Sequence, residues 1–172
     1  MVSSSETRKV MTGAAFEATA GASPLASDIE PPLGAHLIAP RHGYAHHGLY
    51  VGHGMVVHYA GYCHRQQRGP VEELPLAAFA DGHDITMLST TAARYTATVS
   101  VQRARSRLGE DRYRLLTNNC EHFCTWCLYG ESHSTQVRHC LIHPLKGLRL
   151  AGGMLMSWLR TIAAPAWQCV EM

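Results

Sequence analysis

The segment Asn118-Asn119-Cys120-Glu121-His122-Phe123 has the residue types best suited to covalent chemistry in this chain. Asn118 or Asn119 can cap a helix that begins near Cys120 and ends at Gly130. A cysteine in the first turn of a helix feels the positive end of the macrodipole and nearby unpaired N–H groups, which favour thiolate over thiol. The same groups can stabilise an oxyanion during acyl transfer. Cys120 is therefore a candidate nucleophile, the alternative being a buried structural cysteine.

Histidines supply a candidate base for this thiol. The 172 residues include 12 histidines, many of them between His36 and His64. Two apolar stretches, 46–51 and 55–60, flank Gly52-His53-Gly54, which predicts a β-hairpin. A three-residue turn would pair Val51 with Met55 and place Gly48 opposite His58.

This pairing would place His46 and His58 on one face of the hairpin, because strand side chains alternate. The two would be diagonal neighbours, roughly 7 Å apart at the backbone, with Gly48 leaving room between them. A two-residue turn would place them on opposite faces. As a same-face pair, one imidazole can take the thiol proton while the other holds it in the correct tautomer. Each histidine alone is as well explained as a surface residue or a satisfied core residue.

A zinc site competes for the same cysteines, since Cys120, His122, Cys124 and Cys127 are closely spaced sulfur and nitrogen ligands. Cys120, Cys124 and Cys127 would share a helix face, but His122 would point about 200° round from Cys120. Structural zinc sites usually take ligands from two separate segments. We therefore expect no metal and no cofactor, with Cys124 and Cys127 as core thiols.

Composition limits the classes of function. The net charge of +2, without any block of like charges, gives no indication of a nucleic-acid partner. Six cysteines, unevenly spread, are too few for a disulfide framework and indicate reduced thiols. The N-terminal residues lack the apolar stretch of a secretory signal, so we expect a cytoplasmic protein.

The chain divides into three parts by amino-acid composition. Residues 1–33 are rich in Ser, Ala, Gly and Thr and predict a disordered leader, closed off by Glu30-Pro31-Pro32. Residues 34–140 form the expected catalytic domain. Residues 141–172 form an apolar tail interrupted by basic residues, too short in its uncharged run to span a bilayer. The tail is either a helix packed on the domain or an interfacial helix that gives peripheral membrane contact.

Other elements complete an α+β pattern in which strands come first and helices later. Residues 84–88 predict a short strand, and residues 91–108 predict a helix that Gly109 ends. A second helix follows from Cys120.

The residues also resemble a known family, the lecithin retinol acyltransferase-like proteins, relatives of the NlpC-type cysteine peptidases. The similarity runs from about Gly34 to Val137, and the 118–123 motif is its most specific part. It also covers the stretches 34–38, 44–52, 56–59 and 104–110. The resemblance implies a circularly permuted papain-like (NlpC-like) α+β fold, with an antiparallel sheet packed against a helix that carries the nucleophilic cysteine at its N-terminus.

The resemblance also implies roles. Base, orienting residue and nucleophile would fall on His46, His58 and Cys120, and the substrate would be a phospholipid or another acyl ester that forms a thioester on the enzyme. Two positions depart from animal members: Ala35 stands for an aspartate, and His47 stands for an aromatic residue. Animal members often end in a membrane-spanning helix, whereas this tail carries Lys146, Arg149 and Arg160.

We consider three functions and expect the first of them. The first is an acyltransferase or phospholipase A-type acyl hydrolase, the second is an amidase or peptidase like the NlpC relatives, and the third is a non-catalytic interaction module.

Overall fold

A computed structural model describes residues 22–26, 29–41, 44–62 and 68–142. They form one antiparallel six-stranded sheet in the order β1-β6-β2-β3-β4-β5. The strands are β1 (Ala22–Pro24), β2 (His36–Arg41), β3 (Tyr44–Gly52), β4 (Met55–Gly61), β5 (Gly69–Pro75) and β6 (Thr86–Leu88). The helices are α1 (Leu76–Ala80), α2 (Ala97–Arg105), α3 (Cys120–Tyr129) and α4 (Thr135–Ile142). The α+β class expected from the sequence is confirmed.

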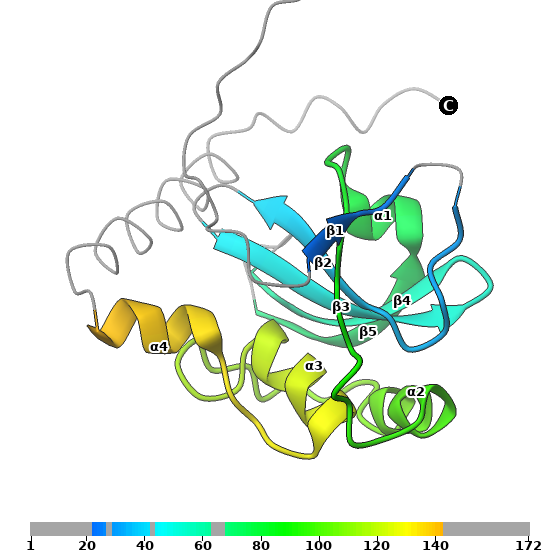
Figure 1. The fold of residues 1–172 in the computed structure, drawn as a ribbon. Coiled ribbons are helices and arrows are strands. Elements are labelled where there is room, and N and C mark those ends of the chain that lie inside the picture. The colour runs from blue at the N-terminus through cyan, green and yellow to red at the C-terminus, as the bar shows by residue number, and fades with distance from the viewer. Residues whose placement is uncertain (1–21, 27–28, 42–43, 63–67, 143–172) are drawn as a thin grey trace, which may run out of the picture.

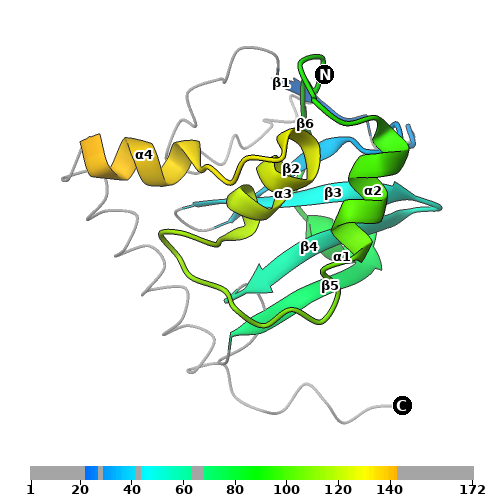
Figure 2. The same cartoon turned by 90° about the horizontal axis from the view of Figure 1, so that it is seen from below.

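The sheet separates two layers of helices. The short helix α1 covers one face, whereas α2 and α3 cover the other (Figures 1 and 2). Phe79 of α1 is fully buried in a cluster with Leu37, Tyr50 and Val56. On the other face, Cys120 and Phe123 of α3 are buried in a second cluster. Its other members include Leu49, Val57 and Tyr59 of the sheet. Alternate residues of β3 and β4 thus serve two different cores, as the period of two requires.

The hairpin between β3 and β4 differs from the predicted one in its turn. Gly52 pairs with Met55, so the loop contains only His53 and Gly54, both with positive φ (54° and 69°). Positive φ at both central positions is the geometry of a type I′ turn. However, Tyr50 pairs with Val56, which leaves Val51 as an extra residue in β3. This bulge restores the predicted pairing.

The predicted pairing of Gly48 with His58 is therefore present, although the predicted turn was wrong. A two-residue turn alone would have moved His58 to the opposite face from His46. The single-residue bulge moves it back, because one extra residue shifts the register by one.

Of the two predicted helices, the one that begins at Cys120 agrees with the structure better than the one predicted over residues 91–108. Helix α3 begins at Cys120 after its cap Asn119 and ends at Gly130 with φ 80°, as predicted. Helix α2 covers only Ala97–Arg105 of the predicted 91–108. It begins later because Arg94 and Tyr95 donate their backbone N–H groups to the carbonyl of Leu128 in α3.

Helix α2 also ends before Gly109, since the backbone there bonds to β5. Gly109 donates to the carbonyl of Val71, and Val71 donates to the carbonyl of Glu110. The strand β6 is the shorter core of the predicted 84–88 strand. Sequence inspection assigned no element to β5, α1 or α4.

The leader and the tail were predicted only from amino-acid composition. Within the range of the predicted leader, Ala22–Pro24 form β1, which pairs with β6 at the edge of the sheet. Of the predicted tail, Leu141 and Ile142 end α4 with exposed side chains, and residues 143–172 lie outside the described residues. Within the described ranges, the helices are all too short and polar to cross a bilayer.

We expect Gly48→Ala to lower the free energy of unfolding by about 1–3 kcal/mol, the usual cost of overpacking a core. A Cβ at this position would lie 2.6 Å from Val56 Cγ1 and 2.7 Å from the Phe79 ring, and both side chains are fully buried. Urea denaturation of the purified protein measures the change. Glu131→Ala is the control, because this exposed position lies outside the helices and strands and the change adds no buried volume. Equal losses in the two variants would contradict the packing argument.

Candidate active site

The two histidines predicted as a pair are in direct contact. His46 Nε2 lies 2.7 Å from His58 Nδ1, and the ring planes are nearly perpendicular at 89°. Both side chains are buried, and the Phe79 ring of α1 lies 5.4 Å from His46 and 5.9 Å from His58. The pair therefore belongs to the α1 side of the sheet.

The outer nitrogen of His58 faces a carboxylate. His58 Nε2 lies 3.4 Å from Oε1 of Glu72 in β5, and it has no aligned hydrogen-bond partner. Glu72 follows from the register, since it is the cross-strand partner of His58. A proton on Nε2 of His58 would be stabilised by this carboxylate, which leaves Nδ1 to accept from His46 Nε2.

Cys120 is the first residue of α3, and the cap of this helix is complete. The Asn119 side-chain oxygen accepts from the backbone N–H groups of Glu121 and His122, both at 3.0 Å. The ring of His122 returns to the Asn119 backbone, which closes a capping box. His122, considered above as a zinc ligand, thus stabilises the helix end, and burial lowers its pKa. Two first-turn N–H groups expected to be unpaired are used by the cap.

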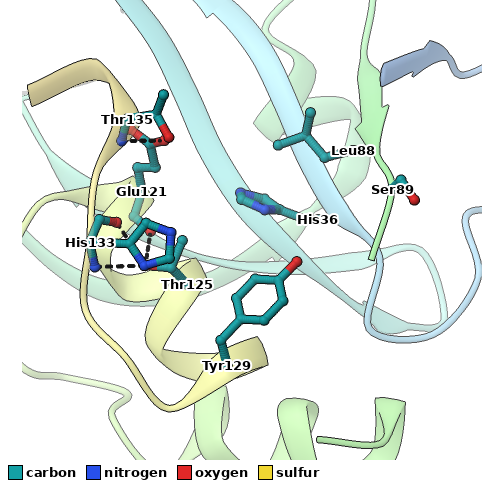
Figure 3. A pocket seen from close by; sticks show the side chains of 8 residues that line it. All are labelled: His36, Leu88, Ser89, Glu121, Thr125, Tyr129, His133 and Thr135. Atoms are coloured by element: carbon teal, nitrogen blue, oxygen red, sulfur yellow. Dashed lines mark hydrogen bonds between the residues drawn. The ribbon is translucent and has the colours of Figure 1, made fainter. Parts of the chain in front are cut away.

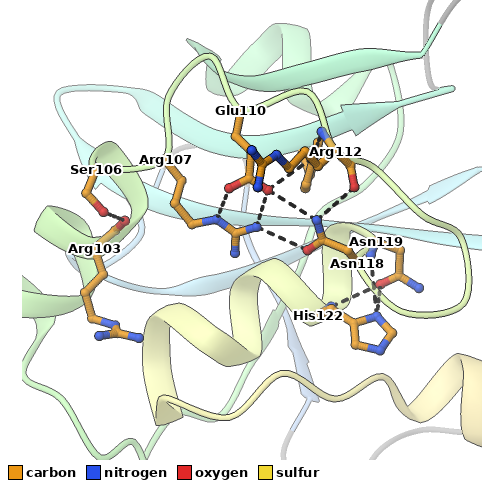
Figure 4. A network of polar contacts seen from close by, with 9 residues as sticks. Arg103, Ser106, Arg107, Glu110, Arg112, Asn118, Asn119 and His122 are labelled. Carbon is orange, nitrogen blue, oxygen red and sulfur yellow. Dashed lines mark hydrogen bonds and ion pairs between the residues drawn. The ribbon is translucent and has the colours of Figure 1, made fainter.

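A polar network beside the cap connects residues 104–110 with residues 118–123, two of the stretches that resemble the family (Figure 4). Arg107 donates to both oxygens of Glu110, at 2.8 and 2.6 Å, and to Asn118 Oδ1 at 3.1 Å. The hydrogen bonds from Arg107, opposed by burial, hold the pKa of Glu110 at about 2. Asn118 also donates to Glu110 and to the carbonyl of Arg112. The residue pair before Cys120 is therefore held rigidly.

The first turn of α3 lies where β3 and β4 separate. Their ladder ends at Gly48 and His58, although both strands continue beyond these residues. On one side of the turn, the Phe123 ring lies 6.3 Å from the ring of Tyr59 in β4. On the other side, Glu121 contacts Gln136, which bonds to Ala45 of β3. The body of α3 packs on the opposite face of the sheet from α1.

The remaining described thiols are poor nucleophiles. Burial raises the pKa of Cys127 to about 12 and also raises the pKa of Cys124 well above its ordinary value. Burial also raises the pKa of Cys140 in α4. Within the described ranges, no three His, Cys, Asp or Glu side chains gather as a metal site would require.

A second histidine pair occupies the α3 side of the sheet. His36 Nε2 lies 2.9 Å from His47 Nδ1, and burial lowers the pKa of both, that of His36 to about 3. His36 also lines a cavity of about 160 Å³ with Glu121, Tyr129 and His133 (Figure 3). Cys120, His46 and His58 do not line this cavity.

Sequence inspection missed the polar residues around the pair and the nucleophile. Glu72 became a neighbour of His58 only through the pairing of β4 with β5, a strand that was not predicted. Glu121 stands within the 118–123 motif, but its partners Ser134 and Gln136 follow α3 in a segment without any recognised signal.

Comparison with known proteins gives one family. The lecithin retinol acyltransferase model matches residues 29–133. The human phospholipase A and acyltransferase 2 is 34% identical over 123 residues, which cover 62% of this chain and 76% of that protein. Bovine and mouse lecithin retinol acyltransferases are 57% and 54% identical over 35 residues, 15% of their length. The chain belongs to the lecithin retinol acyltransferase family.

We expect Asn119→Ala to destabilise the protein by about 0.5–2 kcal/mol, the usual cost of losing a helix cap. Two backbone N–H groups would lose their acceptor in a buried position. Thermal unfolding followed by circular dichroism measures the loss. Asn119→Asp is the matched variant, because a carboxylate also caps and also favours the positive helix end. If Asp were as destabilising as Ala, the bond from Asn119 to the carbonyl of Leu115 would be the more important contact.

Cys124 and Cys127 should resist alkylation in the folded protein at pH 8. Their pKa values lie above this pH, so both remain in the unreactive thiol form. Peptide mass mapping after brief iodoacetamide treatment checks the prediction, with urea-unfolded protein as the control in which both react. Rapid modification of either residue in the folded protein would contradict it.

Proposed function

We propose that this member of the lecithin retinol acyltransferase family transfers acyl groups from phospholipid through a thioester on Cys120. The family and the human relative named phospholipase A and acyltransferase 2 support the reaction class. The observation that carries the proposal is the 2.7 Å contact of His46 with His58, and the capped first turn of α3 at Cys120 supports it.

His46 is the proposed base. Since His58 Nδ1 accepts from His46 Nε2, the proton of neutral His46 sits on Nε2 and its lone pair on Nδ1. Nδ1 can then take the proton of the Cys120 thiol. The resulting imidazolium is stabilised through His58, whose Nε2 faces Glu72. His58 thereby has the orienting task of the third member of a triad.

The chemistry proceeds in two balanced steps. The Cys120 thiolate attacks the ester carbonyl carbon and forms a C–S bond, and the lysophospholipid oxygen leaves with the proton held by His46. An amine, alcohol or water then gives its proton to His46, attacks the thioester carbon and releases the thiolate. The positive end of α3 favours both the thiolate and the oxyanion beside it.

The fold proposal follows from the same elements. An antiparallel sheet bears the histidines, a helix begins with the cysteine, and the histidines precede the cysteine in the chain. We take this order as the basis for a circularly permuted papain-like fold, related to the NlpC peptidases. An amidase or peptidase of that group uses the same triad and differs in the bond attacked, so substrate tests must separate the two.

Incubation of the full chain with mixed phosphatidylcholine and phosphatidylethanolamine vesicles should produce an acyl adduct, visible in the intact mass and removed by hydroxylamine. Cys120→Ala should form no adduct, because the thioester needs this sulfur. His46→Gln should slow adduct formation by about 10²–10⁴-fold, the usual contribution of a general base.

His139→Gln is the matched control, since it changes another histidine of the described domain, in α4. An adduct that persists in Cys120→Ala would refute the nucleophile. Cleavage of peptide or isopeptide substrates, with no fatty acid released from the vesicles, would establish the amidase instead. A wild-type chain inert toward both substrate classes would indicate an interaction module.

A further inference from the structure

The side chain of Gln136 takes the place of a missing strand partner. Its Oε1 accepts from the backbone N–H of Ala45 at 3.0 Å, and its Nε2 donates to the Ala45 carbonyl at 3.2 Å. A primary amide that bonds both groups of one residue mimics a neighbouring residue in an antiparallel ladder. Gln136 belongs to α4, 91 residues further along the chain.

The backbone of β3 shows which neighbour is replaced. Tyr50 exchanges hydrogen bonds with the segment before β2, since its N–H donates to Ala35 and its carbonyl accepts from Gly34. Successive residues of a strand direct these groups to alternate sides. Ala45 therefore directs its N–H and carbonyl toward β4, which has already separated from β3 at this level. Gln136 stabilises the separated state of the strands.

The same amide is joined to the nucleophile helix. Gln136 Nε2 lies 3.3 Å from Oε2 of Glu121, and the Gln136 backbone N–H donates to that oxygen at 3.1 Å. Glu121 also accepts from Ser134 Oγ at 2.5 Å and from the Thr135 N–H at 3.0 Å. Burial opposes ionisation of Glu121, but nearby His47 and these donors lower its pKa nonetheless.

One continuous connection thus runs from Cys120 through its neighbour Glu121 to Gln136, and from Gln136 to Ala45 and its neighbour His46. Each end of this connection is one peptide bond from a proposed catalytic residue. The orientation of the amide is determined, because Oε1 must accept from Ala45 and Nε2 must donate. Nε2 also lies 2.9 Å from His47 Nε2, so His47 accepts there and carries its proton on Nδ1, toward His36.

We propose that Gln136, held by Glu121, is a positioning residue that sets the geometry of the Cys120 thiol relative to His46. This inference rests on the proposed function, because it takes Cys120 and His46 as nucleophile and base. Gln136 does not touch the reacting atoms. It acts by holding the β3 backbone beside His46 and the first turn of α3 in one rigid unit.

Gln136→Leu tests the proposal, because leucine has a similar volume but cannot bond to Ala45 or Glu121. With a soluble thioester substrate, we expect kcat to fall by about 10²-fold, the effect of a displacement of about 1 Å, with little change in KM. The rate of Cys120 alkylation by iodoacetamide at pH 7 should also fall, because a displaced His46 no longer takes the thiol proton. Cys120→Ala supplies the background of each measurement.

Gln136→Glu adds a readout that a purely structural role would not give. The protonated carboxyl keeps the acceptor of the amide and one of its two donors, so it can still bond both backbone groups of Ala45, whereas the ionised form repels Glu121 and the Ala45 carbonyl. The alkylation rate of Gln136→Glu relative to wild type should therefore rise as the pH falls. The titratable groups around this position are Glu121 of α3, His47 of β3, His36 of β2, and His133 and His139 on either side of it.

Arg138→Ala, an exposed change two residues further in α4, should match wild type in every measurement. A Gln136→Leu variant that keeps the native alkylation profile and kcat would overturn the positioning role. So would a loss in which KM, the melting temperature and the rate fall together in Leu and Glu variants at every pH. If the phospholipid adduct fails to form but Gln136→Leu still slows Cys120 alkylation, the proposed function fails and the positioning role stands.

Discussion

The bulge at Val51 decides which histidines can act together. The type I′ turn at His53-Gly54 matches the twist of the strands, but by itself it would place His46 and His58 on different faces. One extra residue in β3 corrects the register over the rest of the ladder. The 2.7 Å contact of the imidazoles depends on this single residue, whereas the pairing of β4 with β5 places Glu72 opposite His58.

The separation of β3 from β4 beyond Gly48 matters for the proposed reaction, because the histidine pair and α3 lie on opposite faces of the sheet. The histidine pair packs against Phe79 on the α1 side, while the body of α3 packs on the other side of the sheet. A continuous ladder would keep the two apart, because the backbone of a sheet is a barrier between its faces. Opening β3 from β4 exposes backbone groups that need partners, and the Gln136 amide satisfies those of Ala45.

Sequence patterns predicted the parts of this site that depend on local rules. Asn119 as cap and Gly130 as terminator of α3 follow from short-range preferences, and both are present. The alternation of His46, Gly48 and His58 predicted the correct pairing even though the turn was wrong, since a bulge and a shorter loop give the same register as a longer loop. Nothing local indicates Glu72 or Gln136, because their roles come from contacts between distant segments. The late start of α2 has the same cause, since backbone bonds to Leu128 replace the first predicted turns.

The two histidine pairs are both buried, but the carboxylates near them differ in exposure. His36 and His47 lie in the interior, where desolvation lowers their pKa values and favours the neutral rings that the Gln136 network needs. A charge on His47 would remove the acceptor that receives Gln136 Nε2 and disturb the amide that spans to Ala45. His46 and His58 lie beside a different carboxylate, since the outer nitrogen of His58 faces the partly exposed Glu72. Glu121 also lies near His47, but burial outweighs it and keeps the pKa of His47 low. In the proposed reaction the His46–His58 pair gains a proton, and Glu72 supplies the counter-charge. The His-His dipeptide at 46 and 47 thus contributes one ring to each face, and the alternation of the strand separates the proposed chemistry from its support.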